Sequence, residues 1–301
     1  MNINRLDFHI SYQCVNRCVF CSEKSRLSRF RGKNLTPAEI KNVLVDKSRQ
    51  GFEYVTFTGG EPTLVPTLPF ALKLSKLLKF RTCVTTNGYG FADCGFCHEI
   101  LPYCDEIMLS MHGDCAEVHD KLSGRNGSYR IFEKALENMS SECASGNKKG
   151  LFLMTNTVLT TENAHCIESM YRKIVANPYV RQCLLSYPAP EGMAYHNYSR
   201  LALPPDEAGQ AAAVAAEILV PAGRMIRFFG FPACHLGVYA KYSNDFYWSP
   251  RITVERGIKD GRTGLRETVS ERPVRRRHYD DKCSACSYRN SCGGFFNAVR
   301  E

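Results

Sequence analysis

Short β-rich runs alternate with amphipathic helical runs over residues 6–220, and this alternation constrains the fold more than any other feature of the sequence. Strands are predicted at 6–13, 53–58, 81–86, 105–111, 151–159 and 180–187. Helices are predicted at 36–50, 64–79, 91–102, 128–140, 163–176 and 206–220. Strand, helix and strand in this order build right-handed βαβ units around a parallel sheet. Six units are too few to close an eight-stranded barrel. We therefore predict an α/β fold, a partial (β/α)6 barrel like an incomplete TIM barrel, with its reactive groups at the carboxyl ends of the strands.

The pattern changes at about residue 224. The stretches RMIRFFGF and DFYWSPRITV have the pattern of antiparallel strands, and the tail CSACSYRNSCGG carries three cysteines. We therefore predict a core domain over residues 1–222 and a small cysteine-rich domain over residues 223–301.

Composition restricts the compartment and the kind of cysteine chemistry. The start of the chain lacks the profile of a signal peptide, and no apolar run reaches the roughly 18 residues that a membrane span needs. We therefore expect a cytoplasmic protein with no membrane partner. Because that compartment is reducing, the 15 cysteines are expected to be metal ligands, catalytic thiols or buried apolar residues rather than disulfides.

The net charge of +9 comes partly from two basic stretches, KSRLSRFRGK at 24–33 and ERPVRRRH at 271–278. They are either solvated loops or contacts for an anionic partner such as a phosphorylated substrate. Nucleic acid is not the partner that we expect.

The sequence CVNRCVFC places Cys14, Cys18 and Cys21 directly behind the first predicted strand. Three thiolates on a short loop can hold three corners of a [4Fe–4S] cluster. A structural metal site closes with a fourth ligand nearby, whereas an open coordination position is typical of a reactive site. The next cysteine is Cys83. The missing fourth thiol therefore predicts a reactive iron.

This loop resembles the CxxxCxxC motif of the radical S-adenosylmethionine (SAM) superfamily. The resemblance implies that Cys14, Cys18 and Cys21 bind three irons of a [4Fe–4S] cluster, and that SAM chelates the fourth. An electron passed to the sulfonium then cleaves a carbon–sulfur bond and yields a 5′-deoxyadenosyl radical. The resemblance also implies that Phe20, which precedes the last cysteine, packs near the adenine.

The stretch FTGGEPT at 57–63 follows the second predicted strand. Gly59 and Gly60 lack a Cβ, so the backbone there can approach a ligand closely. By resemblance to the superfamily's GGE motif, Glu61 accepts hydrogen bonds from the ammonium group of SAM.

Three later strand ends match the superfamily as well. TTNG at 85–88 ends the third predicted strand as it often does in the superfamily. In LSMHG at 109–113, Ser110 is the residue expected to reach the ribose, with His112 as the second choice. Asn156, which ends the fifth strand, is expected to contact SAM or the substrate.

The tail spacing CxxCxxxxxC involves Cys283, Cys286 and Cys292. Taken alone, it is equally typical of a zinc knuckle. Beside the first motif, it resembles the SPASM extension or its shorter form, Twitch, which carry auxiliary [4Fe–4S] clusters. The SPASM pattern has a further cysteine where this chain has Phe296. We therefore expect one auxiliary cluster, with Cys234 as its fourth ligand and a role in electron transfer or substrate binding.

Several of the remaining cysteines carry expectations of their own. Those expected to be small buried residues are Cys83, Cys97, Cys104 and Cys183. Cys94 and Cys97 form a CxxC inside a helical pattern, and a metal site is not expected there. Cys115 follows the fourth strand and is a candidate hydrogen donor to a substrate radical. His119 and Asp120 are acid/base candidates, with loop capping as the alternative.

The substrate is not specified by these motifs. Because the cluster loop begins 13 residues from the start of the sequence, with no room ahead of it for a leader-binding domain, we expect a small molecule that is oxidised or epimerised. The alternative is a maturase that crosslinks or epimerises a ribosomally made peptide. A remote third alternative is a non-enzymatic zinc or iron–sulfur module. Either enzyme also needs an electron donor such as flavodoxin or ferredoxin.

Overall fold

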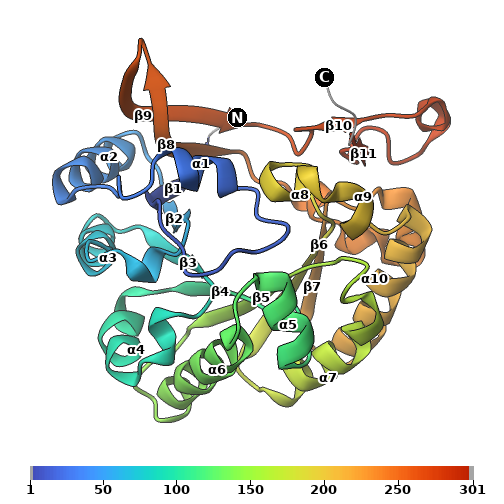
Figure 1. The fold of residues 1–301 in the computed structure, drawn as a ribbon, viewed down its shortest axis with the longest axis horizontal. Coiled ribbons are helices and arrows are strands. Elements are labelled where there is room, and N and C mark those ends of the chain that lie inside the picture. The colour runs from blue at the N-terminus through green and yellow to red at the C-terminus, as the bar shows by residue number, and fades with distance from the viewer. Residues whose placement is uncertain (1–2, 298–301) are drawn as a thin grey trace.

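Seven parallel strands follow one another in chain order across a single sheet of this protein, whose computed structural model describes residues 3–297. The seven are β1 (Arg5–Ser11), β2 (Tyr54–Gly59), β3 (Arg81–Thr86), β4 (Glu106–Ser110), β5 (Phe152–Val158), β6 (Val180–Ser186) and β7 (Met225–Phe229). The sheet curves into a partial barrel, and Figure 1 shows the longer helices arranged around its outer side. The predicted fold class is confirmed.

The helices predicted from the sequence are present in the crossovers. They are α2 (Pro37–Arg49), α3 (Leu68–Leu77), α4 (Cys94–Ile100), α6 (Ser128–Ala144), α7 (Ile167–Ala176) and α10 (Pro205–Leu219). Further short helices were not predicted, namely α1 (Lys24–Arg29), α5 (Ala116–Ser123), α8 (Gly192–His196) and α9 (Tyr198–Leu201). Helix α2 begins with a capping box. The hydroxyl of Thr36 accepts a hydrogen bond from Glu39 N, and the Glu39 carboxylate accepts one from Thr36 N. This arrangement satisfies two backbone donors of the first turn.

The prediction that RMIRFFGF forms an antiparallel strand was wrong. Strand β7 lies parallel to β6, in a register that pairs Gln182 with Met225 and Ser186 with Phe229. The reason is that α10 acts as one more crossover between β6 and β7. The alternate residues Ile226 and Phe228 are at most 1% exposed. A seventh parallel strand therefore extends the sheet beyond the predicted six units.

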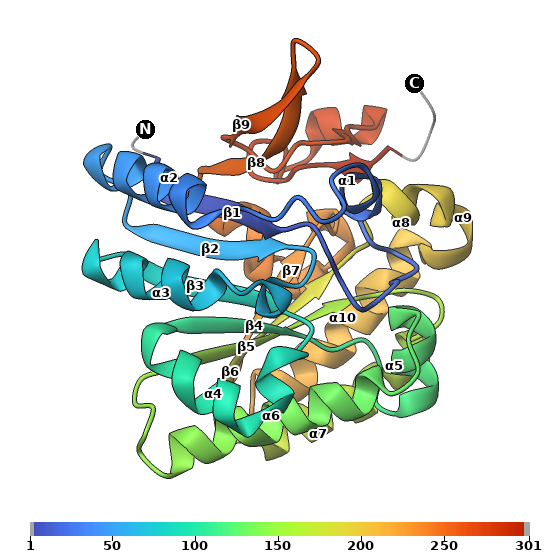
Figure 2. The same ribbon diagram turned by 60° about the vertical axis from the view of Figure 1, so that its left-hand side comes forward.

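The segment after β7 returns to the first strand. Strand β8 (Arg251–Lys259) pairs in parallel with β1 and in antiparallel with β9 (Arg262–Ser270). The prediction of an antiparallel strand in DFYWSPRITV is therefore partly correct. Figure 2 shows the hairpin of β8 and β9 projecting from the body. Two short strands of the tail, β10 (Arg277–His278) and β11 (Phe295–Phe296), form a separate pair. Because β7 and β8 both join the main sheet, the division of the chain at residues 222 and 223 stays a prediction.

The core lies between the sheet and the outer helices. In β1, for example, Leu6, Phe8 and Ile10 are at most 1% exposed, which follows from the period of two along a strand. Within residues 3–297, no helix has both the length and the apolar composition required to cross a membrane.

Candidate functional site

The loop that carries the first three cysteines is held on one side by the end of α5. Backbone hydrogen bonds run from Arg17 N to Ser123 O at 2.8 Å and from Val19 N to Leu122 O at 3.0 Å. These bonds replace regular secondary structure between residues 14 and 21. The path of the loop therefore depends on α5, a helix that comes after β4 in the chain.

The other side of the loop is held by α8. The backbone N–H of Met193 donates to Cys21 O at 2.8 Å, and the side-chain amide of Asn197 donates to Val19 O at 2.8 Å. Gly192 has φ +55, and a Cβ there would lie 2.4 Å from Cys21 O. Helix α8 can approach this closely only because a glycine begins it.

The three thiols of the loop, Cys14, Cys18 and Cys21, converge while remaining half-buried. Burial raises the pKa of Cys14 to about 11 and also raises the pKa of Cys21, and burial together with the neighbouring thiols raises the pKa of Cys18. The three groups are therefore neutral in the metal-free chain near pH 7. Because thiolates are the metal-binding form, binding a metal here releases protons.

The chemistry of the donor set fits an iron–sulfur cluster. Its three donors are all cysteine sulfurs, the ligands that hold [4Fe–4S] clusters, and they stand on one short loop. That the three cysteines are the ligands of such a cluster stays a prediction.

The two glycines of the GGE stretch pack closely against the backbone at the end of β1. A Cβ on Gly59 would lie 2.3 Å from Ser11 O, and one on Gly60 would lie 2.1 Å from Gln13 O. Gly60 N donates to Ser11 O at 2.9 Å, and Glu61 N donates to Gln13 O at 2.8 Å. The lack of a Cβ therefore permits this close approach to the backbone that follows β1, and the contact of Gly59 and Gly60 with SAM stays a prediction. The glycines let this stretch fix the backbone that enters the cysteine loop.

The Glu61 carboxylate is 1% exposed and is bound from within the protein. Oε1 accepts hydrogen bonds from the hydroxyls of Thr63 and Thr86, both at 2.7 Å, and Oε2 accepts one from Asn87 N at 2.7 Å. Burial raises the pKa of Glu61, and these hydrogen bonds oppose the rise. The carboxylate therefore organises the end of β3. Its contact with the SAM ammonium stays a prediction.

Phe20 lies against an imidazole that the sequence assigned to another role. Its ring centroid is 4.6 Å from that of His112, edge to face. His112 is 4% exposed, and burial holds its pKa well below the usual range. The neutral ring of His112 therefore packs against the ring of Phe20.

Polar groups near the ends of three neighbouring strands lie side by side, and two of them are the candidate residues Ser110 and Asn156, whose contact with SAM or substrate stays a prediction. These two residues pair across β4 and β5. Ser186, at the end of β6, donates a hydrogen bond to Asn156 Oδ1 at 2.8 Å. Sequence reasoning missed Ser186. Its place at the last position of a predicted strand was the available signal, since strand ends meet at one edge of a parallel sheet.

The segment after β4, which includes α5, contains the hydrogen-donor candidate and the acid/base candidates. Cys115 is exposed, and its role as a hydrogen donor stays a prediction. Asp120 accepts hydrogen bonds from Tyr129 N at 2.7 Å and Ser128 Oγ at 2.8 Å, and so caps α6. His119 is 2% exposed, and its Nδ1 accepts from His112 N at 3.2 Å. The capping alternative therefore describes Asp120, and His119 is a buried structural residue.

Four of the remaining cysteines behave as expected. The buried thiols, none more than 8% exposed, are Cys83, Cys97, Cys104 and Cys183. Cys94 and Cys97 lie on α4, as the helical pattern predicted.

The four cysteines assigned to an auxiliary site do line one pocket. Cys234, Cys283, Cys286 and Cys292 surround it together with aromatic and glycine residues of the tail. Burial and the nearby thiols of Cys292 and Cys286 raise the pKa of Cys234.

Backbone donors are directed at one of these sulfurs. Cys292 Sγ accepts hydrogen bonds from Ala233 N at 3.4 Å and from Gly294 N at 3.3 Å. Such N–H···S contacts are among the features that tune iron–sulfur clusters. An all-cysteine ligand set with backbone N–H donors to a sulfur is compatible with a [4Fe–4S] cluster. The ligand assignment itself stays a prediction.

A compact polar group beside β1 is not a cation site. Ligand atoms of His9, Glu23 and Glu255 lie within 4.8 Å of one another. However, Arg26 lies 2.9 Å from Glu255 and also binds Glu23, and Arg266 binds Glu255 as well. Two guanidinium groups already neutralise the carboxylates. The group ties β8 to β1 and α1.

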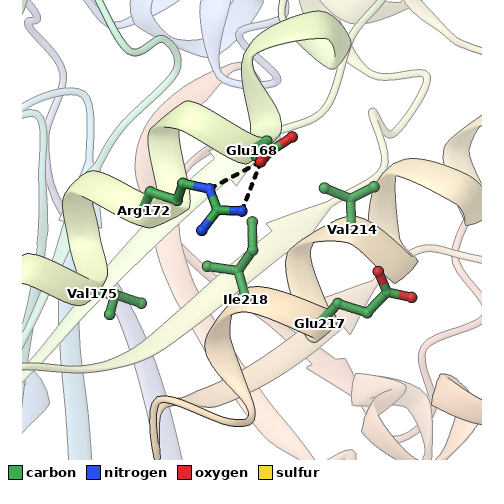
Figure 3. Close-up of a pocket in the computed structure, with 6 residues that line it drawn as sticks. All are labelled: Glu168, Arg172, Val175, Val214, Glu217 and Ile218. Carbon is green, nitrogen blue, oxygen red and sulfur yellow. Dashed lines mark hydrogen bonds and ion pairs between the residues drawn. The ribbon is translucent and has the colours of Figure 1, made fainter.

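A groove between α7 and α10 lies in the outer helix layer. Figure 3 shows its walls, with an ion pair of 2.8 Å between Glu168 and Arg172 on one side and Val214 and Ile218 on the other. None of the residues that line it is a cysteine, and we assign it no part in the chemistry.

The chain belongs to the radical SAM superfamily, whose sequence profile matches residues 8–174. This family uses a [4Fe–4S] cluster and SAM. The family assignment agrees with the three-thiol loop behind β1 and with the partial barrel around it.

Among individual relatives, an S-adenosylmethionine-dependent nucleotide dehydratase of Flammeovirga pacifica is 30% identical over 168 residues, covering 54% of this chain and 55% of the relative. A PqqA peptide cyclase of Bradyrhizobium diazoefficiens is 28% identical over 165 residues, covering 52% and 39%. The solved structure of Streptococcus suis SuiB bound to S-adenosylmethionine matches with a TM-score of 0.65 and 14% identity, covering 98% of this chain and 73% of SuiB. The likeness to SuiB concerns the fold alone. The chain spans about half the length of the first curated relatives that it matches.

Proposed function

We propose that this chain is a radical SAM enzyme that modifies a ribosomally made peptide and uses an auxiliary [4Fe–4S] cluster. The observation that carries the cluster part is the convergence of two separate sets of thiols, one on the loop behind β1 and one lining the pocket of the tail. Cys14, Cys18 and Cys21 would hold the SAM-binding cluster. The auxiliary ligands would be Cys234, Cys283, Cys286 and Cys292.

The chain's own residues would position the reactants. When bound, the cluster and SAM supply the electron that splits a carbon–sulfur bond and gives a radical able to abstract hydrogen from the substrate. Phe20, supported by His112, would pack against the adenine. Ser110 and Asn156, at the carboxyl ends of β4 and β5, would bind SAM or the substrate.

The peptide substrate is supported by relatives whose names describe peptide chemistry, a PqqA peptide cyclase and a mycofactocin maturase. This support is at least as good as the support for the oxidised or epimerised small molecule that the sequence favoured. A nucleotide is the second candidate, because a nucleotide dehydratase matches over 54% of the chain.

Anaerobic reconstitution tests the cluster assignment. The wild-type chain is expected to bind about eight irons, four for each cluster. Replacing Cys14, Cys18 and Cys21 with Ala should leave about four irons and abolish the formation of 5′-deoxyadenosine. Replacing Cys283 and Cys286 with Ala should also leave about four irons but preserve that uncoupled reaction. Tightly held zinc in colourless protein would refute the proposal.

Substrate class is tested by stimulation of SAM cleavage. The reconstituted enzyme is incubated with SAM and a strong reductant, and then with either a synthetic peptide encoded beside its gene or a mixture of nucleoside triphosphates. Faster 5′-deoxyadenosine formation and a changed peptide mass are expected in the first arm. Stimulation in the nucleotide arm alone would overturn the peptide assignment and favour the second candidate.

A further inference from the structure

A side-chain amide that the proposed reaction does not use lies against one of the three loop thiols. Asn87 follows β3 in the TTNG stretch, and its Nδ2 is 3.6 Å from Cys14 Sγ. This is hydrogen-bond distance for a sulfur acceptor. The two residues come from different strand ends, so only the fold brings them together.

The orientation of this amide is determined by its other contacts. Tyr89 N donates to Asn87 Oδ1 at 3.1 Å, so the oxygen end of the amide faces the backbone N–H. The NH₂ end must then face Cys14. An amide whose oxygen is identified by a donor is not subject to the usual ambiguity between oxygen and nitrogen.

The turn that carries Asn87 is itself held in place. The backbone N–H of Asn87 donates to Glu61 Oε2 at 2.7 Å, and Gly88 N donates to Thr86 Oγ1 at 2.9 Å. Thr86 in turn donates to Glu61 Oε1 at 2.7 Å. The buried carboxylate of Glu61 thus fixes the backbone of the donor residue, and Tyr89 N fixes the direction of its side chain.

We propose that Asn87 donates a hydrogen bond to the Cys14 thiolate of the SAM-binding cluster and raises its reduction potential, with Glu61 as the positioning residue. The inference rests on the proposed cluster assignment. Hydrogen bonds to cluster sulfurs help to set reduction potentials. Reduction adds one negative charge to the cluster, and an N–H donor stabilises the more negative state more strongly.

The test is a redox titration of the reconstituted enzyme, followed by electron paramagnetic resonance. The SAM-binding cluster is recognised as the one whose signal changes when SAM is added. Asn87→Ala and Asn87→Leu both remove the donor, and each should make one-electron reduction about tenfold less favourable, a shift of about 59 mV to lower potential. Asn87→Asp places a carboxylate beside the thiolate and should shift the potential further.

Asn197→Ala is the matched control. It removes an amide that clamps the same loop through Val19 O and does not contact a sulfur. Its potential should equal that of the wild type.

Three results would overturn the inference while the cluster assignment stands. They are an unchanged potential in both Asn87→Ala and Asn87→Leu, an equal shift in Asn197→Ala, and loss of the SAM-responsive cluster from both Asn87 variants, which would assign Asn87 to cluster retention instead. A wild-type enzyme with no SAM-responsive signal would overturn the inference and the proposed function together.

Discussion

Phe296 stacks on Tyr187, with ring centroids 6.3 Å apart and planes inclined by 11°. Tyr187 directly follows β6, whereas Phe296 lies in β11 of the cysteine-rich tail. Gly230, which follows β7, leaves room for this ring, because a Cβ there would lie 2.6 Å from it. The contact seats the tail on the end of the barrel at which the strands terminate. Phe296 occupies the position at which the SPASM pattern has a cysteine.

Phe296→Ala should loosen the tail without disturbing the first cluster. Loss of a half-buried aromatic contact is expected to cost about 2 kcal/mol. The iron content should fall from about eight towards about four per chain, while uncoupled SAM cleavage persists. Phe70→Ala, at an exposed position of α3, should change neither iron content nor stability. Full iron content in Phe296→Ala would show that the stack does not support the tail site.

Gly60→Ala should displace the backbone that enters the cysteine loop. The new Cβ would lie 2.1 Å from Gln13 O, a backbone atom that cannot move aside without moving β1. We expect a loss of several kcal/mol, about 2–4, and impaired iron binding at Cys14, Cys18 and Cys21. Denaturant unfolding and iron analysis would measure both effects. Gly264→Ala is the control, since nothing lies within 4 Å of its added Cβ. Normal iron content in Gly60→Ala would contradict the prediction.

Stability should decrease as the pH falls from 7 to 5, in part because of His119. Burial lowers the pKa of His119 to about 4, whereas an unfolded histidine titrates near 6.5. Between these values the unfolded chain binds the extra proton, so acid favours unfolding. The contribution of this group at pH 5 is about 2 kcal/mol. Urea unfolding at several pH values should show a smaller pH dependence for His119→Gln, which keeps a hydrogen-bond acceptor for His112 N. An equal slope in the two proteins would exclude a buried neutral imidazole.

Asp120→Ala should reduce stability and leave the chemistry intact. The carboxylate caps α6 through Ser128 and Tyr129, and loss of a cap costs about 0.5–2 kcal/mol. Thermal unfolding and the rate of 5′-deoxyadenosine formation would be compared with those of Glu137→Ala, an exposed position on the same helix. Abolished SAM cleavage in a folded Asp120→Ala protein would restore the acid/base role.

The sequence by itself determined the alternation of strands and helices, because periods of two and 3.6 residues are local properties of the chain. It also determined where α2 begins, since a capping box involves residues only three apart. The spacing of Cys14, Cys18 and Cys21 was enough to identify them as a set, because they share one short loop. The burial of other cysteines was predicted from the strands and helices that carry them.

Only the tertiary structure decided what each candidate contacts. The direction of β7 depends on the crossover through α10, and its antiparallel prediction failed because a short apolar run has the same pattern in either orientation. Glu61 is bound by Thr63, Thr86 and Asn87, and two of these donors come from another strand end. A buried carboxylate takes the nearest donors, and which donors are nearest is set by the packing of distant segments. For the same reason the sequence did not predict the contact of Asn87 with Cys14. Both residues belong to recognised motifs, TTNG and CVNRCVFC, but the motifs do not say which residues lie next to each other in the fold.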